Sequence, residues 1–292
     1  VLRNKGPKRI DPLFIIKQGP HMASAQVGMF LGAKGPNSSL YSACASGNDA
    51  LGVALNYIRL GYADVMLAGG TDASISPVII AGMGLLGALS REMDPTRASR
   101  PFDLNRNGFV YGEGVGMVVL ESYEHAMRRG APILAELAGA GWSFDAYSET
   151  APDAEMEALA MSVALQDAGV SPEEIDYINA HGTSTKLNDA SETRAIKAVF
   201  GNSAYSIPIS SNKSMIGHGI AAAGALEAIA TVKTINEGII PPTINYDTPD
   251  PECDLDYVPN IARRANVGMA LSNAFGFGGQ NCCLVIRRFT DK

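Results

Sequence analysis

The chain reads Ser38-Ser39-Leu40-Tyr41-Ser42-Ala43-Cys44-Ala45-Ser46-Gly47 where a strand-like run meets a helix-like run. We predict a strand over residues 38–43 and a helix that begins at Ala45. The helix is indicated by apolar residues at the i, i+3, i+4, i+7 spacing of one buried face. These residues are Leu51, Ala54, Leu55 and Ile58. The junction between strand and helix therefore falls at a cysteine.

Cys44 stands at the predicted start of that helix. A helix N-terminus has free backbone N–H groups and the positive end of the helix dipole, and both stabilise a thiolate. A cysteine in such a place can have a lowered pKa and act as a nucleophile. The alternative is a buried cysteine that only packs as a small hydrophobic side chain.

Composition and charge restrict the class of protein. The chain has 292 residues, 46% of them hydrophobic, a net charge of −7 and four cysteines. This composition is typical of a globular protein, and the acidic balance argues against general nucleic-acid binding. No apolar run approaches the roughly 20 residues of a membrane span, and the N-terminus has no secretory h-region. We expect a reduced, cytoplasmic protein without membrane segments.

Strand-like and helix-like segments alternate along the chain, which is typical of an α/β fold built on buried sheets. Helix 154–168 is expected to bury Met156, Leu159, Ala160 and Val163. A second long helix is expected over 216–237. The apolar segments predicted as strands are 64–68, 116–120, 175–179, 207–211 and 284–286.

The order of elements repeats. In each half a strand leads into a reactive-looking position and a helix, and the half closes with a glycine-rich segment and an apolar strand. The glycine-rich segments are an expected hairpin over 108–116 and a turn at 275–279. We therefore divide the chain into two halves, residues 1–129 and 130–292. Before its reactive strand the second half has strands and helices over 135–206, whereas the first half has only residues 1–37 before Ser38. The first half is therefore expected to be truncated at its N-terminus. The alternative is an asymmetric protein that never had those elements.

Two histidines lie where α/β folds place ligands. His181 follows a strand, and His218 lies near Lys213 at a strand-to-helix transition. Either one can instead be a structural histidine whose hydrogen bonds are satisfied. No spaced pair of His, Cys or Asp lies on one helix face, so no metal site is predicted.

The segment Phe275-Gly276-Phe277-Gly278-Gly279 is a glycine-rich turn. It could be only a tight turn, or it could offer an N–H group to a developing oxyanion. A nucleophilic cysteine with two histidines and no acidic orienting residue differs from a cysteine protease. Two neutral histidines that donate to one point suit the stabilisation of the negative charge of an enolate or of a departing carboxylate.

Four motifs contain the candidate residues: Tyr41-Ser42-Ala43-Cys44-Ala45-Ser46-Gly47, His181-Gly182-Thr183-Ser184-Thr185, Lys213-Ser214-Met215-Ile216-Gly217-His218 and Asn273-Ala274-Phe275-Gly276-Phe277-Gly278-Gly279. Together they resemble the β-ketoacyl-ACP synthases, and most closely the elongating enzyme of type II fatty acid synthesis. The resemblance covers essentially the whole chain, and it implies a thiolase-like fold of two duplicated halves in layers α-β-α-β-α.

The resemblance also implies a role for each matching residue. Cys44 would carry the acyl chain as a thioester, while His181 and His218 would support the decarboxylation of malonyl-ACP. The N–H groups of Cys44 and Phe277 would form the oxyanion hole, with Phe277 also as a gate. Residues implied to tune the histidines are Lys213 and Glu227, and those implied to bind substrate are Thr183, Thr185, Phe275 and Gly276.

The resemblance implies acyl carrier protein as the partner, with substrates on its phosphopantetheine arm and no other cofactor, and it implies a homodimer. Because carrier protein is acidic, a local basic patch is expected, for which Arg91, Arg97, Arg128 and Arg129 are candidates. Two alternatives stay open. The chain could be a polyketide ketosynthase, or an inactive fragment that serves only as a structural or dimerising piece.

Overall fold

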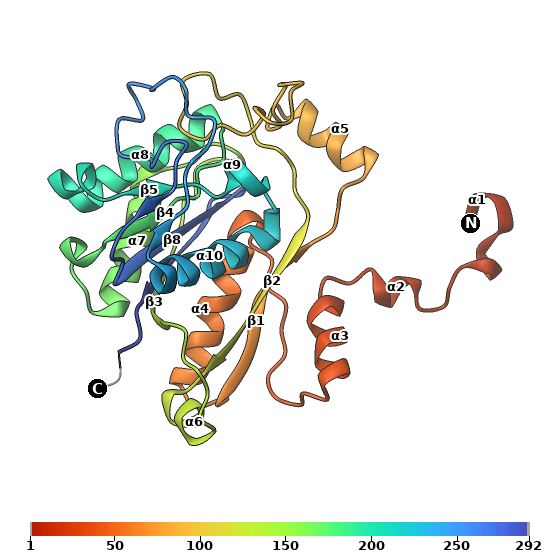
Figure 1. The fold of residues 1–292 in the computed structure, drawn as a ribbon. Coiled ribbons are helices and arrows are strands. Elements are labelled where there is room, and N and C mark those ends of the chain that lie inside the picture. The colour runs from red at the N-terminus through yellow and green to blue at the C-terminus, as the bar shows by residue number, and fades with distance from the viewer. Residues whose placement is uncertain (1, 291–292) are drawn as a thin grey trace. The chain divides into compact units, whose positions relative to one another are not determined.

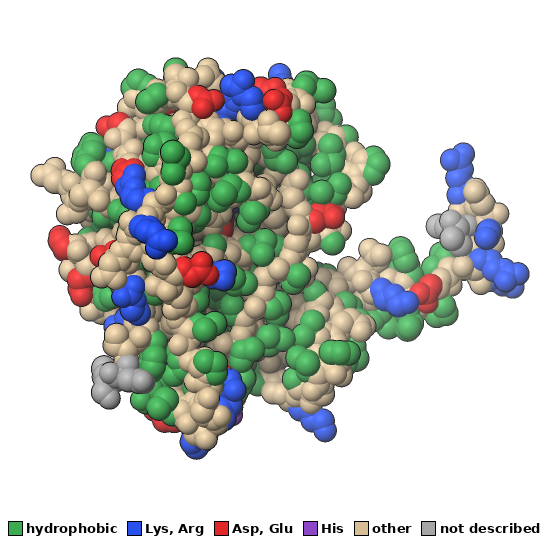
Figure 2. Space-filling model, in the orientation of Figure 1, with side chains coloured by type: hydrophobic (Ala, Val, Ile, Leu, Met, Phe, Trp, Pro, Cys, Tyr) green, Lys and Arg blue, Asp and Glu red, His purple; other side chains and the backbone are tan. Residues whose placement is uncertain are grey.

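A computed structural model describes residues 2–290, which form two compact units. The N-terminal unit extends to Tyr41 and consists of short helices (Figure 1). They are α1 (Leu2–Lys5), η1 (Pro7–Arg9), α2 (Phe14–Lys17) and α3 (Met22–Leu31). This unit is basic: residues 1–41 hold six Lys and Arg and one Asp, a net charge of +5 (Figure 2).

The second unit begins at Ser42 and alternates helices with strands. Its α-helices are α4 (Ser46–Arg59), α5 (Pro77–Leu85), α6 (Tyr123–Arg128), α7 (Ala154–Ala168), α8 (Lys186–Phe200), α9 (Lys213–Ile216) and α10 (Ala223–Glu237). Its 3₁₀ turns are η2 (Ala43–Ala45), η3 (Pro172–Glu174), η4 (Gly201–Tyr205) and η5 (Ile220–Ala222). Its strands are β1 (Val65–Asp72), β2 (Gly114–Glu121), β3 (Glu136–Phe144), β4 (Tyr177–Asn179), β5 (Ile209–Ser210), β6 (Ile239–Ile240), β7 (Arg263–Arg264), β8 (Met269–Gly276) and β9 (Gln280–Arg287).

The largest sheet has the order β3-β9-β8-β4-β5. Strands β8 and β9 form an antiparallel hairpin, whereas β4 is parallel to both β8 and β5. Strands β1 and β2 form a separate antiparallel pair over eight residues each, and β6 pairs with β7. Because β4, β5 and β8 are parallel, their carboxyl ends meet at one edge of the sheet.

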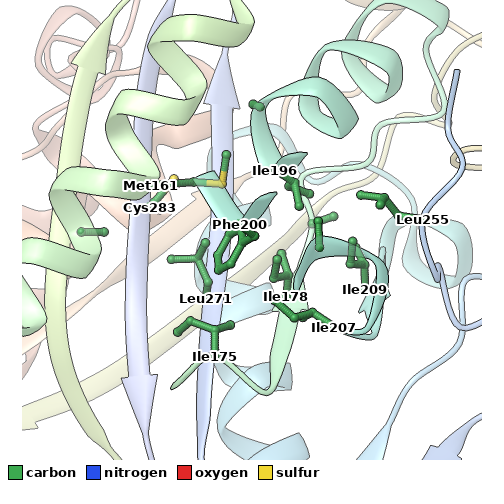
Figure 3. Packing of buried hydrophobic residues seen from close by; sticks show 14 of the residues in the cluster. Met161, Ile175, Ile178, Ile196, Phe200, Ile207, Ile209, Leu255, Leu271 and Cys283 are labelled. Carbon is green, nitrogen blue, oxygen red and sulfur yellow. The ribbon is translucent and has the colours of Figure 1, made fainter. Parts of the chain in front are cut away.

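Helices cover both faces of the five-stranded sheet (Figure 1). Helices α7 and α8 pack together on one face, while α4 and α10 lie between the other face and the β1–β2 pair. Alternate residues of β8 enter two different cores: Leu271 packs with Ile178 and Met161 on the α7 side, and Ala270 packs on the α4–α10 side (Figure 3). The predicted alternation of helix and sheet layers is therefore present, with a sheet that is buried on both faces.

Helix α7 has the predicted limits and part of the predicted buried face. Ala160 is buried as predicted, but Leu159 is 45% exposed, and Met156 and Val163 are half-buried. The other buried residues of the helix are Glu157, Met161, Ala164 and Leu165. Glycines of β3 explain the difference, because they let the small residues of the helix approach the sheet closely. A Cβ at Gly141 would lie 2.2 Å from the backbone nitrogen of Ala164.

Three other predictions of local structure are wrong. Residues 38–43 form no strand, since their backbone has no ladder partner among residues 2–290. The segment 108–116 is not a hairpin: Phe109 and Tyr111 form isolated bridges with distant residues, and only β2 is regular. The helix predicted over 216–237 begins at Ala223, because Gly217 has a φ of +74° that interrupts the helix after α9.

Glu157 is an acidic side chain on the buried face of α7. Its Oε2 accepts a hydrogen bond of 2.9 Å from the Ser191 hydroxyl, and its Oε1 has no partner among residues 2–290. Burial, and next the nearby Glu192 carboxyl, raise the pKa of Glu157 well above its usual value. The folded protein therefore retains a proton that the unfolded chain releases above about pH 4.3.

This proton makes stability depend on pH. The folded state binds more protons than the unfolded state. The free energy of unfolding therefore falls as the pH rises above the pKa of a free glutamate. We predict that Glu157→Gln, which retains an acceptor for Ser191, raises the melting temperature by about 2–6 °C at pH 8 and by less at pH 5. Calorimetric melting at the two pH values measures this.

Glu155→Gln, an exposed change on the same helix, is the matched control and should show no such dependence on pH. An equal effect of Glu157→Gln at both pH values would contradict the assignment.

Candidate active site

Cys44 lies in the turn η2, directly before α4, as the sequence predicts. The turn is tight: Ala43 has a φ of +48°, and the Ser46 hydroxyl donates to the Ala43 carbonyl at 2.7 Å. Gly276, at the end of β8, approaches the turn so closely that a Cβ there would lie 2.5 Å from the Ser42 carbonyl oxygen. The fold therefore fixes the thiol against the end of the central hairpin.

The resting state of this thiol differs from the prediction. Cys44 is 4% exposed, and burial raises its pKa to about 11. The positive charge of Lys213 and hydrogen bonding from the Phe277 N–H act in the opposite direction, without outweighing burial. The thiol is thus protonated at neutral pH and loses its proton only during reaction.

His181 follows β4 at the carboxyl edge of the sheet, where the sequence predicts it. Its backbone N–H and that of Gly182 donate to the two carboxyl oxygens of Glu192, each at 2.8 Å. Its carbonyl accepts a hydrogen bond of 2.6 Å from Lys213 Nζ, which also lies 3.3 Å from its ring Nδ1. Burial, and next the Lys213 charge, lower the pKa of His181 well below its usual range.

His218 lies between α9 and η5, and its backbone is fixed on both sides. Its N–H donates to the Val110 carbonyl at 2.7 Å, and its carbonyl accepts from the Gly112 N–H at 2.8 Å. The backbone N–H of Ile220 lies 3.1 Å from its ring Nδ1. Burial, followed by Lys213, lowers the pKa of His218 well below its usual range, so both histidines are neutral at neutral pH.

The hydrogen bonds also assign the tautomer of each ring. An ammonium and a backbone N–H can only donate, so Nδ1 of His181 and Nδ1 of His218 are acceptors. In a neutral imidazole the proton then lies on Nε2. Each histidine is therefore arranged to donate one N–H from Nε2.

The structure brings the three side chains together. The Cys44 sulfur, a ring nitrogen of His181 and a ring nitrogen of His218 lie within 4.8 Å of one another. The ring centroids of the histidines are 5.4 Å apart, with planes at 84°. Three such atoms can also ligate a metal ion, but the two Nε2 protons and the Lys213 charge both oppose a cation here.

Lys213 and Glu227 form a fully buried ion pair beside the histidines. Burial raises the pKa of Glu227 to about 7, although Lys213 lowers it. Glu227 lies on α10 and Lys213 on α9, so the pair joins the two helices that follow β5.

The turn between β8 and β9 holds the other predicted residues of the site. Phe275 and Gly276 end β8, and the ring of Phe275 lies 5.7 Å from that of His181. Gly278 donates its N–H to the Glu149 carbonyl at 2.9 Å, and Asp145 donates its N–H to the Gly279 carbonyl at 2.8 Å. These contacts hold the Phe277 N–H toward the Cys44 sulfur.

A cavity of about 420 Å³ reaches from Cys44 and the histidines toward the surface. Thr183 and Thr185 line it, and their hydroxyl oxygens are 2.9 Å apart. Phe275, Gly276 and Phe277 line it as well, whereas Lys213 and Glu227 lie behind the histidines and do not.

Sequence reasoning missed Glu192, whose carboxylate holds the backbone of His181 and also accepts a bond of 3.0 Å from the Asn273 side chain. The sequence does contain an indication of a buried carboxylate. Asp189 and Glu192 lie three residues apart on the helix face that also carries Ala195 and Ile196. Acidic residues on an apolar helix face are rarely buried without a partner.

The high pKa of Cys44 can be measured by alkylation. Since iodoacetamide reacts with the thiolate, the rate at Cys44 should rise about tenfold per pH unit and show no plateau below about pH 9.5. Lys213→Met should slow the reaction at pH 8, because it removes the charge that favours the thiolate. Peptide mass spectrometry follows the rate, and a plateau at or below pH 8 would contradict the assignment.

Family comparisons agree with this geometry. The family model described as beta-ketoacyl synthase, N-terminal domain, matches residues 1–126, and the one described as beta-ketoacyl synthase, C-terminal domain, matches residues 134–247. The chain is 50% identical over 292 residues to 3-oxoacyl-[acyl-carrier-protein] synthase 2 of Synechocystis, and covers 70% of that protein. It is 47% identical over 290 residues to the Staphylococcus aureus protein of the same name, again covering 70%.

Solved structures give the same result. A solved complex of a type II polyketide acyl-carrier protein with its ketosynthase bound to the hexaketide contains a similar chain. That chain has a TM-score of 0.95 and 44% identity, with coverage of 97% of this chain and 71% of that one. A β-ketoacyl synthase from Burkholderia phymatum has a TM-score of 0.94 and 40% identity, with coverage of 99% and 71%. The predicted thiolase-like fold is thus confirmed, and the chain belongs to the β-ketoacyl synthase family.

Proposed function

We propose that this acyltransferase, a β-ketoacyl-ACP synthase, uses Cys44, His181 and His218 for a decarboxylative condensation. The observation that carries the assignment of residues is the convergence of one thiol and two neutral imidazoles within 4.8 Å. The reaction joins an acyl group to the two-carbon unit of malonyl-ACP, giving 3-oxoacyl-ACP and CO₂ in fatty acid elongation.

In the first half-reaction the Cys44 sulfur attacks the thioester carbonyl of acyl-ACP. The Cys44 proton leaves with the departing pantetheine thiol, so a thiol with a pKa of about 11 needs no permanent thiolate state. The N–H groups of Cys44 and Phe277, which both act on the sulfur, are placed to donate to the tetrahedral oxyanion.

In the second half-reaction malonyl-ACP loses CO₂, and the negative charge moves to its thioester oxygen as an enolate. The Nε2–H groups of His181 and His218 donate to that oxygen. The enolate carbon then attacks the Cys44 thioester, and the C–S bond breaks to release 3-oxoacyl-ACP. The Cys44 thiolate that leaves takes up one proton.

Acyl carrier protein is the proposed partner, and its phosphopantetheine arm is the proposed carrier of both substrates, with no further cofactor or metal. The N-terminal unit supports this partner: its net charge of +5 leaves −12 on the other residues, since −7 minus +5 is −12. A basic surface of this kind complements an acidic protein. Of the arginines proposed from the sequence, Arg97 and Arg129 are engaged in ion pairs.

Three further proposals concern the whole molecule. We propose that the protein is a homodimer, that it is located in the cytoplasm, and that it divides into functional halves 1–129 and 130–292. Two observations support the division: the two family models meet between residues 126 and 134, and each half contains one antiparallel strand pair, β1–β2 or β8–β9. No helix of residues 2–290 is long and apolar enough to span a membrane.

Fatty acid elongation is favoured over polyketide synthesis. The relatives named 3-oxoacyl-[acyl-carrier-protein] synthase 2 are 47–50% identical to the chain, whereas the polyketide ketosynthase structure is 44% identical.

Intact-mass analysis after mixing with acyl-ACP tests the first half-reaction. We predict one acyl adduct, located on Cys44 and absent from Cys44→Ala. His181→Ala should still form the adduct but release CO₂ from malonyl-ACP at least about 100-fold more slowly, because the enolate loses a donor. Cys253→Ala, which removes a buried cysteine outside the cavity, is the matched control.

Absence of the adduct from a correctly folded wild-type chain would favour the alternative of a structural or dimerising piece. An adduct on a cysteine other than Cys44 would contradict the assignment of the nucleophile.

Alanine substitutions at two neighbouring glycines distinguish displacement of the Phe277 N–H donor from backbone strain alone. Gly278 and Gly279 both have positive φ values, of +91° and +82°, so alanine at either one is strained by roughly 1–2 kcal/mol. Only at Gly279 would a new Cβ also meet Asp145, 2.7 Å from its Cβ. Gly279→Ala should therefore displace the turn and slow acylation of Cys44 by about 10²–10³.

Gly278→Ala is the control and should slow acylation far less. The rate of adduct formation by mass spectrometry compares the two variants, and equal rates would show that the contact with Asp145 does not position the donor.

A further inference from the structure

The loop that follows His181 leads from the bottom of the cavity to its mouth. Side-chain exposure increases along it: His181 is 2% exposed, Thr183 is 5% exposed, Thr185 is half-buried and Lys186 is exposed. All four residues line the same cavity. A ligand whose reactive end lies at Cys44 therefore passes the two threonines before it reaches Lys186.

Buried contacts make this loop rigid. Arg106, which is 2% exposed, donates to the carbonyl of Thr185 from Nε and to the carbonyl of Lys186 from Nη2, each at 3.1 Å. The Ser184 carbonyl accepts a bond of 2.9 Å from the Gly108 N–H. The backbone of Lys186 is thus fixed before any ligand enters, which lowers the entropy lost on binding.

The mouth of the cavity carries two cationic side chains. Lys186 and Arg91 both line the cavity, and neither forms an ion pair within the described residues 2–290. The nearby Asp250 carboxylate is already paired with Arg106. Of the acidic residues that line the cavity, Asp145 is buried and hydrogen-bonded to Asn281, and only Glu149 is exposed.

We propose that Lys186, assisted by Arg91, binds the phosphodiester of the pantetheine arm at the mouth of this cavity. This inference rests on the proposed function, in which the thioester end of the arm lies at Cys44. The phosphate lies at the opposite end of the arm, where the fixed loop carries Lys186 and where Arg91 also lines the cavity; neither cation forms an ion pair within residues 2–290. Lys186 then sets a preference for phosphorylated pantetheine over the same arm without phosphate.

The test uses unreactive ligands, the S-methyl thioethers of 4′-phosphopantetheine and of pantetheine. Each is titrated against alkylation of Cys44 by iodoacetamide, and mass spectrometry gives the concentration that halves the rate. We expect the phosphorylated arm to protect at a roughly three- to tenfold lower concentration. Lys186→Ala should reduce that ratio to below about twofold, and Lys186→Glu or the double change with Arg91→Ala should abolish it.

Lys197→Ala is the matched control, because Lys197 lies on the same helix, is paired with Asp254 and does not line the cavity. It should retain the wild-type ratio. Equal protection by the two arms, protection by neither, or an unchanged ratio in Lys186→Ala would overturn the proposal. Acylation of Cys44 by acyl-ACP in the same protein preparations tests the proposed function separately. If Cys44 is acylated but the two arms protect equally, the phosphate site is wrong and the proposed function stands.

Discussion

The site depends on the ammonium group of Lys213, which is buried and makes three polar contacts. It lies against the carboxylate of Glu227, the carbonyl of His181 and the ring Nδ1 of the same histidine. A buried charge is tolerated only when it is paired and hydrogen-bonded, so each partner is required. Through these contacts one cation fixes the backbone and the tautomer of His181. Burial, and next the Lys213 charge, lower the pKa of both histidines, so both rings are neutral.

The fold supplies the other constraints. The parallel strands β4, β5 and β8 end at one edge of the sheet, which brings His181, Lys213 and Phe275 together from segments far apart in the sequence. The thiol comes from the turn before α4, which packs closely on α10: a Cβ at Gly47 would lie 2.4 Å from the backbone nitrogen of Ala225. Rigid elements thus position every reacting group, and the cavity supplies the route for the substrate.

The sequence predicts the α/β architecture, the limits of α7 and the residues that meet in the site, because hydrophobic periodicity and local motifs are local properties. It predicts the strand over 38–43 wrongly, since a strand also needs a neighbour to pair with. It predicts the buried face of α7 only in part, at Ala160, because that face is decided by Gly139 and Gly141 on a distant strand. The pKa of Cys44 depends on burial, which only the folded chain sets, and the role of Glu192 is likewise a tertiary contact.

The most direct test of the account is the protonation state of the two buried histidines in the resting protein. ¹⁵N NMR of histidine-labelled protein reports both charge and tautomer, and His181→Ala and His218→Ala assign the signals. We predict that both rings are neutral with the proton on Nε2 throughout about pH 6–8. A ring that titrates in that range, or that carries its proton on Nδ1, could not donate to the enolate as described and would contradict the account.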